Sequence, residues 1–234
     1  MQVSIKLLKK VFRRNNIDIE FLEELQRLLV QYGDLFKIDT KKRLARFLSM
    51  SYHEIYIKKN GKIRIRENLN YKSKKQLIKM SYYFRTHPKA LDKAMSLKGE
   101  EKQKFIAINW YGRGSKAKDL GNIKPIDGWN YRGVGIFQVT GRSNYMSVFK
   151  IIEQKLGIVC FNEQGEVYQS LLNSYFGAII SAFGYWYMRK MYKCQNSKCV
   201  IDKINSGLPE SMKKERVNTT IRILNILIKE QSYT

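Results

Sequence analysis

Histidine and cysteine are scarce in this chain of 234 residues, which contains two histidines and three cysteines. The three cysteines (Cys160, Cys194 and Cys199) are too few for a disulfide framework, and so little histidine accompanies them that they form no zinc-binding pattern. We interpret them as free thiols, although Cys194 and Cys199 close a short loop and would be able to pair in an oxidising compartment. The sequence implies neither a metal nor a cofactor.

A long, purely apolar segment is also missing. The N-terminal stretch MQVSIKLLKKVFRRNN is interrupted by lysines and lacks the apolar region of a secretory signal, so we expect synthesis in the cytoplasm without Sec export. Residues 167–188 carry no charge, but glutamine, serine and asparagine side chains and a Tyr-Trp-Tyr run interrupt them. This segment therefore predicts a central buried helix and not a transmembrane segment.

Acidic residues are few: 20 Asp and Glu stand against 44 Lys and Arg, which gives a formal charge of +24. Such a charge concentrates a protein on polyanions, namely nucleic acid, anionic lipid or an anionic cell wall. The lysines are scattered along the chain, and no single arm or helix collects them. Sequence-specific recognition of nucleic acid is therefore not favoured.

Helical periodicity dominates the chain, so we expect a mainly α fold. Apolar residues recur at helical spacing in 19–32 and in the segment after Thr40, and the run SKKQ at 73–76 is typical of a helix start. That helix should end near Pro88, and another should end at Gly112. Residues 112–144 lose the periodicity and predict a long functional loop, and a final amphipathic helix passes through 217–228. No repeat or linker divides the chain, so we expect a single domain over 1–234.

The stretch SYHEIYIKKNGKIRIRENLNY (51–71) contains the most specific local signal. Asn60-Gly61 between alternating residues predicts a β-hairpin with a two-residue turn, and this register places Glu54 opposite Glu67. A three-residue turn would improve the burial pattern and would place Glu67 opposite Ile55 instead. In both registers the two glutamates lie near the open end of the hairpin.

Two neighbouring carboxylates are typical of glycoside hydrolysis, in which one carboxylic acid protonates the leaving oxygen and the other carboxylate activates water. Glu54 borders an apolar helical stripe, which favours its protonated form, whereas Arg64 and Arg66 precede Glu67 and favour its ionised form. Glu54 would then be the acid and Glu67 the base. The alternative is that both glutamates only balance nearby lysines.

Other catalytic motifs are incomplete. His53-Glu54 would need a second histidine at position 57 for a zinc-protease site, where isoleucine stands, and His53 is better explained as a hydrogen-bonded structural residue. The glycines at 133, 135 and 141 do not open a phosphate-binding helix, and no Walker lysine follows them. The aromatic residues at 110, 111, 129 and 131 are either sugar platforms or the packing core of the loop.

The segments RLARFLSMSYHE, RENLNY, DGWNYRGVGIFQVTGRSNY and INSG occur in the order found in family 19 glycoside hydrolases. The chain resembles in particular the chitinase-like lysozymes, or endolysins, of phages and bacteria. The resemblance implies a lysozyme-like, two-lobed helical domain with a small β-hairpin at the catalytic cleft, and an inverting mechanism. Two departures concern the shape of the cleft: Ile55-Tyr56-Ile57 replaces the glycine-rich step after His-Glu, and INSG replaces INGG.

Position by position, the resemblance implies that Glu54 is the general acid and Glu67 the catalytic base. It also implies a set of substrate-binding residues, in which Gln138 and Thr140 place the water and sugar and the others contact the substrate: Gln138, Thr140, Asn144, Tyr145, Asn205 and Arg216.

We therefore predict a peptidoglycan-degrading glycosidase of the lysozyme type, whose basic surface holds it against an anionic cell wall. The alternatives are a chitinase acting on N-acetylglucosamine polymers and a catalytically silent, basic binding module. Chitin is nearly neutral, so the charge of +24 favours the wall. The expected protein is a monomer without a transmembrane segment or a specific nucleic-acid partner. It would act in the periplasm or cell wall after holin release, specialised secretion or lysis.

Overall fold

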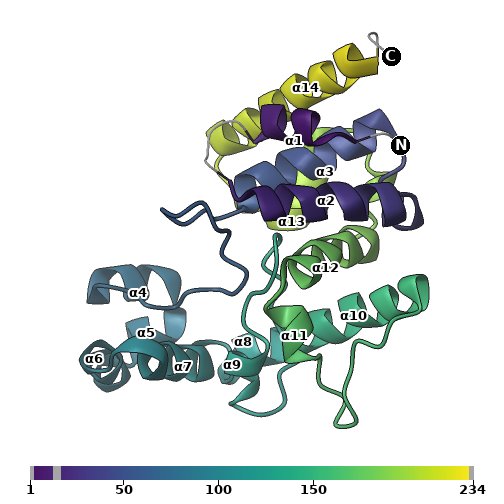
Figure 1. Ribbon diagram of the computed structural model, residues 1–234. Coiled ribbons are helices and arrows are strands. Elements are labelled where there is room, and N and C mark those ends of the chain that lie inside the picture. The colour runs from purple at the N-terminus through teal and green to yellow at the C-terminus, as the bar shows by residue number, and fades with distance from the viewer. Residues whose placement is uncertain (1–2, 13–16, 232–234) are drawn as a thin grey trace. The chain divides into compact units, whose positions relative to one another are not determined.

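A computed structural model describes residues 3–12 and 17–231 of the chain (Figure 1). These residues are mainly α-helical, as the sequence predicts, and none of them belongs to a named β-strand. In the described residues the α-helices are α1 (Ile5–Val11), α2 (Ile19–Tyr32), α3 (Lys41–Glu54), α4 (Lys74–Met80), α5 (Tyr82–Thr86), α6 (Pro88–Ser96), α7 (Gly99–Trp110), α8 (Gly114–Asp119), α9 (Asp127–Asn130), α10 (Arg142–Leu156), α11 (Gln169–Leu172), α12 (Tyr175–Met188), α13 (Ser197–Asn205) and α14 (Glu210–Gln231), with short 3-10 helices η1 (Asp34–Phe36) and η2 (Met191–Lys193).

The chain divides into two compact units. Unit 1 comprises Met1–Ile65, Gly135–Phe137 and Val148–Thr234, and unit 2 comprises Arg66–Val134 and Gln138–Ser147. Helix α10 begins in unit 2 and ends in unit 1.

Unit 1 is organised around α3 and α12. The stripe Leu44, Phe47 and Leu48 of α3 is fully buried, and the ring of Phe47 makes edge contacts with Phe183 and Trp186 of α12. On its other side, α3 packs against α14, which also lies alongside α1 in Figure 1. The C-terminal end of α3 is thereby held within the helical core of its own unit.

Helix α12 is the buried helix of unit 1. Nine of its fourteen residues are buried, which its lack of charge makes possible. The sequence predicted one helix across 167–188, but the structure has α11 and then α12, because Ser174 caps a new helix by accepting a hydrogen bond from the Gly177 N–H at 3.0 Å. Across the described part of the chain, no helix is both long and apolar enough to span a membrane.

Unit 2 has a separate hydrophobic core. Tyr71, Tyr83, Trp110 and Trp129 pack against it as partly buried residues. The core itself is built by residues of the segment after Arg66, of helices α4 to α7, and of the positions directly after α7 and α8: Leu69, Leu77, Phe84, Leu91, Ala94, Ile106, Ala107, Tyr111 and Leu120. The aromatic residues of this region are therefore largely packing residues, although Trp110 and Trp129 stay partly exposed.

Several helix boundaries follow the sequence signals closely. Helix α2 spans the predicted residues, and the Thr40 and Ser73 hydroxyls accept capping hydrogen bonds from the N–H groups of Arg43 and Gln76. The helix predicted to run from Ser73 toward Pro88 is instead two short helices, α4 and α5. The predicted loop 112–144 contains two helices, α8 and α9, and the first residues of α10.

The predicted β-hairpin is wrong as a pair of strands. The chain does turn back at Lys59–Gly61, where Gly61 has a φ of 81°, but within the described residues only an isolated antiparallel bridge between Ile57 and Ile63 follows. This bridge fits neither of the two predicted registers. The residues expected to form the second strand of the hairpin pair with 133–134 instead. The Glu67 N–H donates to the Gly133 carbonyl at 2.8 Å, and Arg66 forms an isolated bridge with Val134.

The interpretation of all three cysteines as free thiols is also wrong. Cys194 and Cys199 form a disulfide, and only Cys160 of the three is free and buried. The loop that the disulfide closes is joined to α3, because the Arg46 guanidinium donates a hydrogen bond of 2.6 Å to the Cys194 carbonyl. The disulfide therefore fixes a loop that contacts the helix ending at Glu54.

Candidate active site

Glu54 is the last residue of α3, in unit 1, and its carboxylate forms an ion pair with the Arg216 guanidinium on α14. The Arg216 side chain is 7% exposed and that of Glu54 is 23% exposed. The Arg216 carbonyl also accepts hydrogen bonds of 3.0 Å from the Ser49 and Thr220 hydroxyls. Two of the residues singled out in the sequence are thus in direct contact.

Helix α14 also holds the residue that precedes Glu54. His53 shares a hydrogen bond of 3.0 Å with the Thr219 hydroxyl, so it is a hydrogen-bonded residue, as the sequence indicated. Asn205 ends α13 and is exposed, and its side-chain oxygen accepts a hydrogen bond of 3.1 Å from the Gly207 N–H. The carbonyl end of the Asn205 amide is thus engaged within its own turn.

Tyr185 on α12 is a further neighbour of Glu54 that sequence reasoning missed. Burial raises the pKa of the Tyr185 phenol, the charge of Arg189 lowers it, and the negative charge of Glu54 raises it further. Tyr185 therefore lies within electrostatic reach of the Glu54 carboxylate. Its only sequence signal was its place in the Tyr-Trp-Tyr run of an uncharged helix.

Glu67 lies in unit 2, and hydrogen bonds hold both of its carboxylate oxygens. The Tyr111 hydroxyl donates to Oε1 at 2.8 Å, and the Gly133 N–H donates to Oε2 at 3.1 Å. The backbone is fixed as well, because the Glu67 N–H donates to the Gly133 carbonyl. This arrangement leaves the carboxylate little rotational freedom.

Burial raises the pKa of the Glu67 carboxyl. The hydrogen bonds from Tyr111 and Gly133 lower it, as do the charges of Arg132 and Arg66, but together they do not offset the burial. Glu67 in turn helps to raise the pKa of Tyr71 to about 12, for which burial is the larger cause. The Glu67 carboxyl thus lies in a poorly hydrated part of unit 2 with two nearby cations.

Gln138 lies beside Glu67 around Gly133. A Cβ atom at Gly133 would lie 2.6 Å from the Gln138 Oε1 and 3.3 Å from the Glu67 Oε2, so a larger residue here would displace the Gln138 amide. Gln138 itself has a φ of 48°, an uncommon conformation for a residue with a side chain. Such conformations persist where the surrounding structure imposes them and are frequent at functional sites.

Thr140 and Asn144 complete the turn after Gln138. The Thr140 hydroxyl donates to the Gln138 carbonyl at 2.8 Å, and the Asn144 amide donates to the Thr140 carbonyl at 2.8 Å. Both side chains are partly exposed. The structure therefore brings Glu67, Gln138, Thr140 and Asn144 into one region of unit 2.

Tyr145 is completely buried, in contrast to the substrate contact that the resemblance implied. Its hydroxyl donates to the Arg132 carbonyl and accepts a hydrogen bond of 2.9 Å from the Arg66 guanidinium. Burial raises the pKa of the Tyr145 phenol well above its ordinary range. Tyr145 is thus an internal support for the two arginines whose charges act on Glu67.

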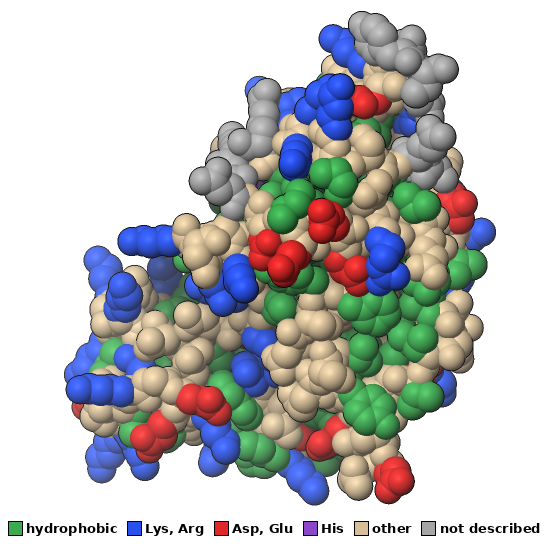
Figure 2. Space-filling model, in the orientation of Figure 1, with side chains coloured by type: hydrophobic (Ala, Val, Ile, Leu, Met, Phe, Trp, Pro, Cys, Tyr) green, Lys and Arg blue, Asp and Glu red, His purple; other side chains and the backbone are tan. Residues whose placement is uncertain are grey.

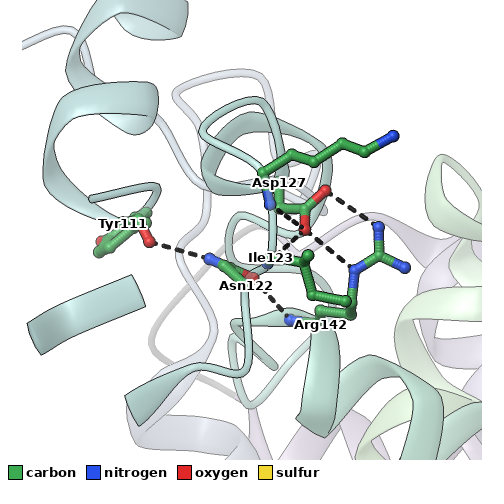
Figure 3. Close-up of polar contacts among 6 residues, drawn as sticks. Tyr111, Asn122, Ile123, Asp127 and Arg142 are labelled. Atoms are coloured by element: carbon green, nitrogen blue, oxygen red, sulfur yellow. Dashed lines mark hydrogen bonds and ion pairs between the residues drawn. The ribbon is translucent and has the colours of Figure 1, made fainter. Parts of the chain in front are cut away.

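A buried ion pair holds the loop that leads to this region (Figure 3). The Asp127 carboxylate accepts two hydrogen bonds of 3.0 Å from the Arg142 guanidinium, and it also accepts the N–H groups of Ile123 and Lys124. Asn122 accepts the Arg142 N–H and donates to the Tyr111 carbonyl, both at 2.9 Å. The ion pair is therefore connected through Asn122 to the residue that hydrogen-bonds Glu67.

The surroundings of the two glutamates differ from those that the sequence spacing predicted. A buried arginine pairs with Glu54, for which an apolar border was expected. Glu67 follows two arginines in sequence, yet burial is the main influence on its carboxyl. Sequence spacing missed Tyr111, Arg132 and Asp127 as supports of Glu67, because their proximity depends on the tertiary fold.

Within residues 3–12 and 17–231, no group of three or more His, Cys, Asp or Glu side chains is arranged to hold a metal ion. The described polar groups around Glu54 and Glu67 are carboxylates, guanidinium groups, amides and hydroxyls. Of these groups, the carboxylates can transfer protons, and the others can form hydrogen bonds to sugar hydroxyls.

We expect Tyr111→Phe to shift the pH profile of catalysis. The change removes a hydrogen bond that lowers the pKa of Glu67, so this pKa should rise further above its already raised value. If Glu67 is the base and must be ionised, the acidic limb of kcat/KM moves to higher pH. If Glu67 is the acid, the alkaline limb moves up instead. Tyr168→Phe, at an exposed site in unit 1, should move neither limb.

Comparison with known proteins identifies the family. The chain is 32% identical over 170 residues to a glycosyl hydrolase family 19 domain-containing protein of Haemophilus influenzae, and the match covers 72% of each chain. No family model matches the chain. The class that this match indicates is a glycoside hydrolase, and the described structure is mainly helical. The chain belongs to glycosyl hydrolase family 19.

Proposed function

We propose that this protein is a peptidoglycan-degrading glycosidase that hydrolyses β-1,4 glycan bonds with inversion of configuration. The observation that carries this proposal is the Glu67 site, in which a largely buried carboxylate is held by Tyr111 and Gly133 with Gln138 beside it. A glutamate that only balanced surface lysines would not need burial or two fixed hydrogen bonds. Family membership supports a glycoside hydrolase in general.

The proposed reaction uses the two glutamates as acid and base. Glu67 accepts a proton from a water molecule, and the water oxygen forms a bond to the anomeric carbon as the glycosidic carbon–oxygen bond breaks. Glu54 donates its proton to the leaving oxygen, so one water is consumed for each bond cleaved. Inversion requires the carboxyl groups to lie about 6.5–9.5 Å apart, which leaves room for the water.

The other site residues support this chemistry in distinct ways. We assign Gln138, Thr140 and Asn144 to the water and the sugar, because their side chains lie in the same turn of unit 2 as the Glu67 site. Arg216 holds Glu54 from within unit 1, and we assign the exposed Asn205 to substrate contact. Tyr145 acts indirectly, by fixing Arg66 and Arg132 near Glu67.

Charge supports a cell-wall glycan over chitin as the substrate. Unit 2 alone carries 17 Lys and Arg against 6 Asp and Glu, a net formal charge of +11. On the face shown in Figure 2, Lys and Arg side chains are spread over the surface and are not gathered in one patch. A distributed positive surface suits adsorption to an extended anionic polymer. We propose that the enzyme meets this polymer in the periplasm or wall after holin release, specialised secretion or lysis.

The test is digestion of purified peptidoglycan and of chitin oligomers by the wild-type protein. Mass spectrometry identifies the fragments, and proton NMR recorded during the reaction shows which anomer forms first. We expect glycan fragments with new reducing ends of the α configuration, and faster cleavage of peptidoglycan than of chitin. Cleavage of chitin alone would assign the protein as a chitinase, and cleavage of neither polymer would favour a basic binding module.

A further inference from the structure

Unit 2 contains a pocket of about 510 Å³ that no residue of the proposed active site lines. Its walls come from the α4–α5 region, the end of α7 and the start of α8. All of these elements belong to the same unit, so the pocket is formed within one compact body.

Aromatic rings form much of the pocket wall. Tyr83 and His87 are stacked with centroids 4.1 Å apart and an interplanar angle of 11°, and Trp110 is partly exposed at the other side. Tyr82 also lines the pocket and is 74% exposed. Exposed aromatic faces of this kind pack against the C–H faces of sugar rings, and a pocket of this volume accommodates a small ligand.

The same pocket is lined by two cations and, among its described residues, by no acid. Arg113 and Lys116 stand at the start of α8, and both are exposed. None of the ion pairs formed between described residues uses either side chain. Their charges are therefore available to an anionic group of a ligand.

The pocket is connected to Glu67 through stacked rings. Trp110 stacks on Tyr111 with centroids 4.6 Å apart and an interplanar angle of 26°, and the Tyr111 hydroxyl donates to the Glu67 carboxylate. Trp110 thus faces the pocket while its neighbour holds the candidate catalytic residue. A glycan bound against Trp110 would lie near the Glu67 site of the same unit.

We propose that this pocket binds a sugar unit that carries a carboxylate, with Tyr82 and Trp110 contacting the ring and Arg113 and Lys116 pairing with the carboxylate. The inference rests on the proposed function, because the lactyl group on alternate sugars distinguishes a peptidoglycan strand from chitin, and its carboxylate is free where no peptide is attached to it. The pocket would then select the acidic sugar and set the register of the glycan strand relative to Glu67.

Two monosaccharides test this proposal, since N-acetylmuramic acid differs from N-acetylglucosamine only by the lactyl ether at O3, which carries the carboxylate. Binding is followed in the full-length protein by NMR, with the indole N–H of Trp110 as the reporter and those of Trp129 and Trp186 as references. We expect N-acetylmuramic acid to bind about tenfold more tightly than N-acetylglucosamine, and 0.5 M salt to reduce the preference.

Variants test the cationic and the aromatic residues of the pocket separately. The double substitution Arg113→Gln, Lys116→Gln should remove the preference, and Tyr82→Ala should weaken both sugars about fivefold. The matched control Lys118→Gln, on the same helix but outside the pocket, should bind both sugars as the wild type does. Equal affinity for the two sugars, an unchanged preference in the double variant, or no response of Trp110 would each overturn the proposal.

Neither monosaccharide contains a β-1,4 bond to cleave, so this binding test is independent of catalysis. If the wild-type protein digests peptidoglycan but shows no preference for the acidic sugar, the pocket proposal fails and the proposed function stands. If the preference is found but no glycan is cleaved, the pocket stands and the proposed function fails.

Discussion

Glu54→Gln and Glu67→Gln should each lower kcat for glycan hydrolysis by about a thousandfold. General acid and general base catalysis each contribute roughly 10²–10⁴ to the rate, and glutamine neither donates an acidic proton nor accepts one. Both substitutions are nearly isosteric, so hydrogen bonds to the remaining carbonyl oxygen can persist. The rate is measured by the release of reducing ends from peptidoglycan, and circular dichroism confirms that each variant is folded.

A substrate with a good leaving group distinguishes the two roles. A nitrophenyl leaving group needs little protonation, so a variant of the acid should retain much more activity on a nitrophenyl glycoside than a variant of the base. Because we propose Glu54 as the acid, Glu54→Gln is the variant that should retain more activity on the nitrophenyl glycoside. Glu163→Gln and Glu101→Gln, at exposed sites of units 1 and 2, serve as controls and should match the wild type. Retention of more than about a tenth of the activity by either site variant would contradict its catalytic role.

Asp127→Asn should cost about 3 kcal/mol of the stability of unit 2. The Asp127 side chain is only 2% exposed and pairs with Arg142, whose side chain is 27% exposed, so removing the carboxylate leaves a partly buried charge without its partner. The Ile123 and Lys124 N–H groups would also lose a charged acceptor. Hydrogen exchange monitored by mass spectrometry should show faster exchange over 111–143. Asp119→Asn, an exposed neighbour, should change the stability by less than about 0.5 kcal/mol.

The stabilisation by Asp127 should decrease as the pH falls. Burial alone would raise the pKa of Asp127, but the Arg142 ion pair and the two backbone hydrogen bonds outweigh it and lower the pKa. The stabilisation is therefore present above the ordinary pKa of aspartate and is lost as the pH falls through the lowered value. The wild type should approach the stability of Asp127→Asn in acid. A stability difference that stays constant down to strongly acidic pH would contradict this account.

A double-mutant cycle with Arg142→Gln tests the pairing itself. If the two side chains stabilise the fold through each other, the combined variant should lose much less than the sum of the two single losses. Additive losses would mean that Asp127 acts mainly through the backbone N–H groups of Ile123 and Lys124. The cycle is measured by urea unfolding at neutral pH.

Local signals in the sequence predicted the helices well. The hydroxyls of Thr40 and Ser73 accept the expected capping hydrogen bonds, and the apolar stripe of 19–32 gives α2 its bounds. These features depend on residues within a few positions of one another, so periodicity and capping rules suffice. The two glutamates were found in the same way, through their spacing and the motifs around them.

Contacts between distant segments set the features that sequence reasoning missed. The Asn60-Gly61 signal predicted a long hairpin. The Glu67 backbone is instead hydrogen-bonded to Gly133, so the segment around Glu67 does not pair with the residues before the turn. Arg216 reaches Glu54 from 162 positions away, and Tyr111 reaches Glu67 from 44 positions away. No local pattern encodes these pairings, and they decide the electrostatic environment of both carboxylates.

The separation of Glu54 from Arg216 along the chain also constrains the order in which the protein can be built. Unit 1 combines α3 with α14, whereas unit 2 is drawn from a much shorter and nearly continuous stretch. During synthesis, α3 must wait until α14 has left the ribosome before the two can pack together. Glu54 is therefore made early but acquires its ion-pair partner only after a further 162 residues have been added.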